Sequence, residues 1–136
     1  MEHRKLFDSE PGDWFYLAAD RLRAADPNWQ GEGLTPSGIE LLQESVERFL
    51  KGYLVSCGWK LVKTHDLQRL LADAEAYDAR FAQFEDLAEN LTQDFFAQHY
   101  PGSDLTEVGK NYPQLRQQTG DLLALIKELL PQHFSS

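Results

Sequence analysis

Three polar residues recur at four-residue intervals in one segment of the chain, and a second polar group follows shortly after them. The first three are Gln43, Glu47 and Lys51. Residues spaced by four project from nearly the same side of an α-helix, so a helix here presents an amide, a carboxylate and an ammonium group in one strip. These groups can hold a polar ligand by hydrogen bonds and charge. We therefore predict part of a binding site along this strip.

A second helix is predicted to begin at Thr64, with Thr64 as its N-cap and with His65 and Asp66 in its first turn. The first turn of a helix carries unpaired backbone N–H groups and a partial positive charge, which suit an anionic oxygen. Asp66 opposes that preference. A later histidine, His99, stands near the end of the next predicted helix.

The helix after Thr64 and the helix that ends near His99 are expected to form an antiparallel hairpin that turns near residue 78. The start of the helix after Thr64 then lies alongside the later turns of the helix that ends near His99. Lys51, His65, Asp66 and His99 can therefore converge. The predicted ligand-binding residues form one corner: Gln43, Glu47, Lys51, His65, Asp66 and His99. Lys51 and His99 would supply positive charge, and Glu47 and Asp66 would orient them.

Each of these residues also has a purely structural interpretation. Glu47 and Lys51 can form an ordinary ion pair within a helix, worth about 0.3–0.5 kcal/mol. His65 and Asp66 can cap the helix and tie the turn to it. His99 can be a cation favoured by the helix dipole at a C-terminus.

The sequence offers little to an enzyme that uses a nucleophile, a metal or a cofactor. Cys57 is the single cysteine, has no histidine near it in sequence, and is expected to be buried at a helix C-terminus, which disfavours the thiolate. His65 and His99 lack the helical spacing typical of zinc ligands. We predict no catalytic residue, no metal and no cofactor.

Composition indicates one domain over residues 1–136, with a core from about 12 to 131. The net charge of −9 argues against broad affinity for a phosphate backbone. One cysteine fits a reducing cytosol, and no apolar run is long enough to span a bilayer, so we expect a cytoplasmic protein without membrane contact.

Apolar periodicity is helical nearly throughout the chain. The first helix should end at Asp26, because Pro27 disfavours a helical residue before it. A capping box at Ser37 and Glu40 opens the second helix, which should stop near Gly58. The others are expected after Thr64, from about residue 79 to 100, and from about residue 114 to 131. The fold class predicted is all-α, a five-helix up-down bundle.

Three segments in this order resemble the HEPN family, which comprises small helical domains that accompany or bind nucleotide chemistry. They are QESVERFLKGYL at 43–54, KTHDLQRLL at 63–71 and HYPG at 99–102, and the resemblance covers about residues 12–131. It implies a homodimer and a nucleotidyltransferase protein as partner, with a nucleotide or RNA as ligand. Gly52 lies in mid-helix, where a close approach is expected, and this suggests the Gly52 side for the dimer contact.

The sequence departs from the family in two places. HEPN ribonucleases carry an arginine followed, after four to six residues, by a catalytic histidine. That spacing occurs at none of the arginines here: Arg4, Arg21, Arg23, Arg48, Arg69, Arg80 and Arg116. His99 also stands where relatives have an arginine, which exchanges a permanent charge for a titratable ring.

We therefore expect a non-catalytic HEPN-like domain that binds a small polar or nucleotide ligand, docks onto a nucleotidyltransferase, or does both. One alternative is an enzyme similar to ribonuclease toxins, with a displaced site at His65 or His99. The other is a structural dimerisation module.

Overall fold

The regular structure of the described residues is entirely helical. A computed structural model of the protein describes residues 5–30, 36–99, 102 and 111–134. Within these ranges lie five α-helices and two short 3-10 helices. In chain order they are α1 (Pro11–Gln30), α2 (Pro36–Ser56), α3 (Leu67–Tyr77), η1 (Ala79–Phe84), α4 (Glu85–His99), α5 (Tyr112–Leu129) and η2 (Pro131–His133). The predicted all-α, five-helix fold is confirmed.

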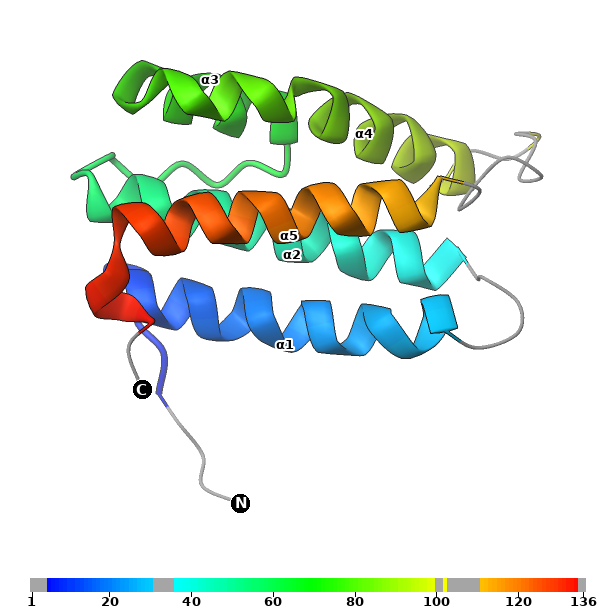
Figure 1. Ribbon diagram of the computed structural model, residues 1–136, viewed down its shortest axis with the longest axis horizontal. Helices are drawn as coiled ribbons and strands as arrows, with labels where there is room; N and C mark the ends of the chain where they lie inside the picture. The colour runs from blue at the N-terminus through cyan, green and yellow to red at the C-terminus, as the bar shows by residue number, and fades with distance from the viewer. Residues whose placement is uncertain (1–4, 31–35, 100–101, 103–110, 135–136) are drawn as a thin grey trace.

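Helix α2 is the centre of the bundle. It contacts α1, α3, α4 and α5, and Figure 1 shows α1 on one side of it and the α3–α4 layer on the other. The apolar side chains of α2 are almost fully buried: Ile39, Leu42, Val46, Phe49, Leu50, Tyr53 and Leu54. Because neighbours cover most of its circumference, α2 also buries the polar side chains Gln43, Ser45, Glu47 and Lys51. A helix enclosed in this way must satisfy its polar groups within the protein.

The segment from Cys57 to Asp66 returns along α2 without helical structure. It turns at Gly58, whose φ of +83° favours glycine, and Figure 1 shows it passing back between α2 and α3. This return carries His65 from the end of α2 to the level of Glu47, about two turns before that end. The candidate site therefore lies beside the middle of α2.

Two predicted helix boundaries were wrong, and one predicted helix is divided. Helix α1 continues through Pro27 to Gln30, although a proline removes one backbone hydrogen bond and crowds the preceding turn. Arg116 of α5 holds Asp26, the residue before this proline, with bonds of 2.7 and 3.3 Å. Helix α3 begins at Leu67 with Asp66 as its N-cap, since the Asp66 carboxylate accepts the first free N–H groups. The fourth helix is divided, and its first turns form η1.

Gly52 packs tightly against Phe15 of the same chain. A Cβ atom built on Gly52 would lie 2.5 Å from Cε1 of Phe15. The close approach predicted at this glycine is therefore present, but it joins α1 to α2 within one protomer. Gly52 gives no reason to place a dimer contact on this side of α2.

Candidate functional site

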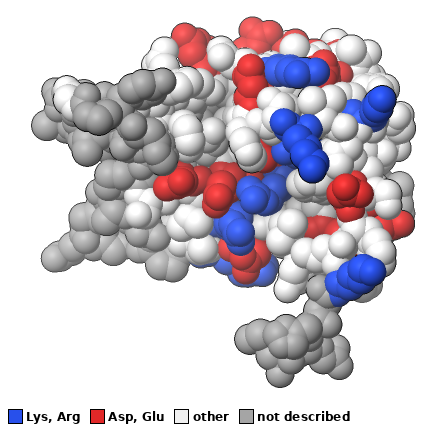
Figure 2. Space-filling model, turned by 180° about the vertical axis from the view of Figure 1, so that it is seen from behind, with Lys and Arg blue, Asp and Glu red and all other residues white. Residues whose placement is uncertain are grey.

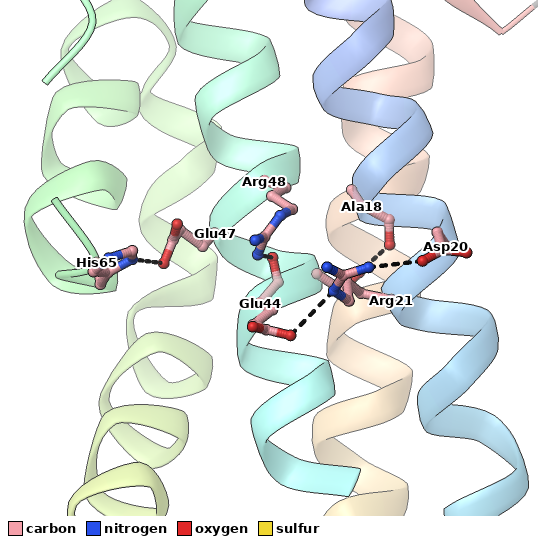
Figure 3. Close-up of polar contacts among 8 residues, drawn as sticks. Ala18, Asp20, Arg21, Glu44, Glu47, Arg48 and His65 are labelled. Atoms are coloured by element: carbon pink, nitrogen blue, oxygen red, sulfur yellow. Dashed lines mark hydrogen bonds and ion pairs between the residues drawn. The ribbon is translucent and has the colours of Figure 1, made fainter. Parts of the chain in front are cut away.

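The Glu47 carboxylate connects two of the predicted site residues. Its Oε2 accepts a hydrogen bond from Lys51 Nζ at 3.0 Å, and its Oε1 lies 2.9 Å from His65 Nδ1. Figure 3 shows Glu47 and His65 pointing toward each other from α2 and the start of the α3 region. The Glu47 side chain is only 6% exposed, whereas that of His65 is 85% exposed. The pair thus links a buried carboxylate to a ring at the surface.

Lys51 lies on the inner side of this network. Its side chain is 6% exposed, and its ammonium group stands 5.5 Å from the centre of the Trp14 ring in addition to its bond with Glu47. A cation in such a position is stabilised by the ring and by the carboxylate. Its main contacts are therefore inside the protein, between α1 and α2.

Asp66 has a structural task in this arrangement. Its Oδ1 accepts hydrogen bonds from the backbone N–H groups of Gln68 and Arg69 at 3.1 and 3.2 Å, and its own N–H donates to Thr64 Oγ1. The donors that were expected to bind an anionic oxygen at the start of α3 are consequently occupied by the cap.

His99 is the last residue of α4, and its side chain lies outside the described part of the chain. Phe95, one turn earlier in α4, lines the same pocket as His65. The convergence of His99 with the other site residues stays a prediction.

A pocket of about 180 Å³ opens beside His65 and Glu47. It is lined by Glu40, Gln43, Glu44, Glu47, His65 and Phe95. Gln43 is 6% exposed, and its Oε1 is buried with no hydrogen-bond partner among the described residues. Sequence analysis placed Gln43, Glu47 and His65 in one site but missed Glu40, Glu44 and Phe95. The spacing of Glu40 and Glu44 from Gln43 and Glu47 could have indicated the first two.

Polar contacts continue from the pocket toward α1. Glu44 Oε2 accepts from Arg21 Nε at 3.2 Å, and Arg21 also pairs with Asp20 at 2.7 Å. Arg48 donates to the Glu44 carbonyl oxygen at 3.1 Å, as Figure 3 shows. Figure 2 shows one face of the molecule, on which the lysine and arginine side chains of the described residues lie among acidic ones and form no continuous basic patch. A face of this kind gives weak general attraction for nucleic acid.

Comparison with known protein families gives one family whose model covers most of the chain. The model of the HEPN domain matches residues 12–130, nearly the whole chain. The chain belongs to the HEPN family. No curated protein and no solved structure matches it in the corresponding searches. The motif around Thr64–Leu67 that carried the resemblance thus supplies the cap and the exposed histidine of this HEPN domain.

A second hollow of the HEPN domain, about 240 Å³ in volume, lies between α3 and α4. Its lining includes Glu75, Glu85 and Glu89. Burial raises the pKa of the Glu75 carboxyl above its ordinary value, and the neighbouring Glu85 carboxylate raises it further.

The described part of this HEPN domain holds no group of three or more histidine, cysteine, aspartate or glutamate side chains placed to bind a metal ion. Among the same residues, no helix has the length and apolar character required to cross a lipid bilayer.

Proposed function

We propose that this HEPN domain is a non-catalytic binding module that takes a small polar group, free or part of a nucleotide, in the pocket beside His65. The observation that supports this is the orphaned Oε1 of Gln43. A buried acceptor without a hydrogen bond costs about 1–3 kcal/mol, and a ligand donor placed there would remove that cost. Natural proteins keep few such groups, and this one belongs to a residue that lines an open pocket.

The size of the pocket limits what enters it. Its volume of about 180 Å³ is below the range of roughly 300–1,000 Å³ typical of sites that enclose a drug-sized ligand. A whole nucleotide would therefore extend outside, with one polar group inserted. The pocket suits a single amide, amine or ring edge.

Titration of the ¹⁵N-labelled protein with four probes tests the proposal. The probes are n-butylguanidinium, n-butyl phosphate, pentanamide and AMP. At least one should shift the side-chain amide signal of Gln43 together with the ring signals of His65. In Gln43→Leu, the shift of the His65 ring signals should require about tenfold more of the same probe. If no probe shifts these signals, the pocket is not a ligand site and the proposal fails.

A displaced ribonuclease site is the second candidate, and the His65–Glu47 contact favours it. With a neutral ring, Nδ1–H donates to the carboxylate and leaves Nε2 as an acceptor on an exposed ring. A carboxylate that orients a histidine in this way is a common arrangement for a general base. No arginine stands at the ribonuclease spacing, so we expect no activity.

The ribonuclease candidate is tested with single-stranded RNA and tRNA, without added metal. The purified protein should leave both intact. Cleavage that persists through purification and is lost in His65→Ala, but not in the variant of another histidine, His133→Ala, would establish the second candidate in place of the first.

Docking onto a nucleotidyltransferase protein, and homodimerisation, complete the proposal. The family suggests both, and Phe96 offers a half-exposed aromatic ring on α4 next to Phe95 of the pocket. Aromatic residues are enriched where protein surfaces meet. Light scattering should give about twice the mass of the 15.6 kDa chain, and a mass of one chain at all concentrations would refute the dimer.

A further inference from the structure

We infer that the pocket beside His65 selects a positively charged nitrogen donor, a guanidinium or ammonium group on a short apolar stem, and rejects phosphate. This inference rests on the proposed function and names the chemical class of its ligand. It differs from the sequence-based expectation, in which Lys51 and His99 hold an anion.

The pocket presents hydrogen-bond acceptors. The buried Oε1 of Gln43 has no donor among the described residues, and the Glu47 carboxylate carries more lone pairs than its two partners use. His65 adds a third acceptor at Nε2 when its neutral ring donates from Nδ1 to Glu47. A ligand that complements these groups must bring several N–H donors.

The charges around the pocket also disfavour an anion. Its lining contains three glutamates and no lysine or arginine. Three nearby cations already have acceptors, and none of them lines the pocket. Arg21 pairs with Glu44 at 3.2 Å and Lys51 with Glu47 at 3.0 Å, while Arg48 donates to the Glu44 carbonyl oxygen at 3.1 Å. A phosphate inserted here would stand among carboxylates, and juxtaposed like charges oppose binding.

The start of α3 offers no compensation to an anion. The N–H groups of Gln68 and Arg69, which could otherwise bind an anionic oxygen, donate to the carboxylate of Asp66. The usual reason for an anion site at a helix N-terminus is thus removed by the cap.

Phe95 completes the recognition of a cation. It contributes an aromatic side chain to a lining that is otherwise polar. An aromatic face attracts a guanidinium or ammonium group, and its edge packs against an alkyl stem. The volume of about 180 Å³ accommodates a head group and a few carbon atoms.

Calorimetric titration of the whole chain with the four probes measures the preference. We expect n-butylguanidinium to bind at least about tenfold more tightly than n-butyl phosphate or pentanamide. Gln43→Leu should weaken its binding about tenfold, because the head group loses an acceptor. Glu44→Gln, a partly exposed position that keeps its shape, should weaken it a few-fold, and Gln114→Leu on α5 should leave it unchanged.

A peptide, acetyl-Gly-Arg-Gly-amide, distinguishes the two sources of such a group. Binding of the peptide as well as the free probe assigns the pocket to an arginine of a partner protein. Binding of the free probe alone assigns it to a small molecule. Either result supports the cation preference.

The outcomes that overturn the inference are distinct from those that overturn the proposed function. If n-butyl phosphate or AMP binds more tightly than n-butylguanidinium, and Gln43→Leu abolishes that binding, the pocket is a ligand site of the opposite preference and only the inference fails. If none of the four probes binds the wild-type protein, both fail.

Discussion

Replacing Lys51 by methionine should destabilise this protein far more than removal of an ordinary helix ion pair. The side chains of Lys51 and Glu47 are each 6% exposed, and Lys51 Nζ lies 3.0 Å from Glu47 Oε2. Coulomb's law gives an attraction of about 5 kcal/mol at this distance with an effective dielectric constant near 20, and desolvation of the two ions offsets part of it. Lys51→Met leaves the Glu47 carboxylate buried without its cation, so we expect a loss of about 3 kcal/mol in the free energy of unfolding.

Urea unfolding followed by circular dichroism at neutral pH measures the loss. Glu47→Leu should cost a similar amount, but the double variant should lose only about 1 kcal/mol, since it buries no unpaired charge. Lys127→Met is the matched control, because Lys127 also stands over an aromatic ring, Phe134 at 5.7 Å, but on the exposed surface. It should cost no more than about 1 kcal/mol. A loss below about 1 kcal/mol for Lys51→Met would refute the reasoning. So would a double variant whose loss in the free energy of unfolding equals the sum of the two single losses.

Three further predictions concern stability. Gly52→Ala should cost about 1–2 kcal/mol in chemical unfolding, because the clash with the Phe15 ring exceeds the gain in helix propensity, and a variant as stable as the wild type would contradict this. Asp66→Ala should cost about 1 kcal/mol in thermal unfolding through loss of the α3 cap, and no change would show that the cap is dispensable. The pKa of the Glu75 carboxyl is raised above its ordinary value of 4.5, so the folded protein binds a proton at Glu75 more strongly than the unfolded chain does. The stability that this protonation contributes is lost as pH rises above 4.5 and through the raised pKa. Calorimetry at several pH values should therefore show Glu75→Gln gaining stability over the wild type as pH rises; a constant difference would contradict this.

Sequence periodicity predicted the helices well because each has an apolar stripe, and the Glu47–Lys51 contact followed from i, i+4 spacing alone. The burial of that pair could not be predicted in the same way. It depends on α1, α3, α4 and α5 all packing around α2, which makes even its polar face an interior surface. A pair that the spacing alone describes as an ordinary ion pair within a helix is therefore buried, because of how the helices pack.

The candidate site was predicted in part for a related reason. His65 and Glu47 were predicted to share one site, and the structure brings His65 Nδ1 to 2.9 Å from Glu47 Oε1. Asp66 was grouped with His65 because neighbours in sequence are expected to share a site, but a cap turns its carboxylate back onto its own helix. Phe95 was not predicted as a site residue, because only the register of α4 against α2 shows that it lines a pocket.

The length of the segment from Cys57 to Asp66, which returns along α2, sets the position of His65 beside that helix. An extended chain advances about 3.3 Å per residue, whereas a helix advances 1.5 Å. Deleting or inserting one residue before His65 would therefore displace its ring by up to about two residues along α2, away from Glu47. The number of residues in this segment, more than their identity, sets whether the carboxylate and the imidazole meet. Relatives with a segment of another length would hold a different pair of side chains at this position.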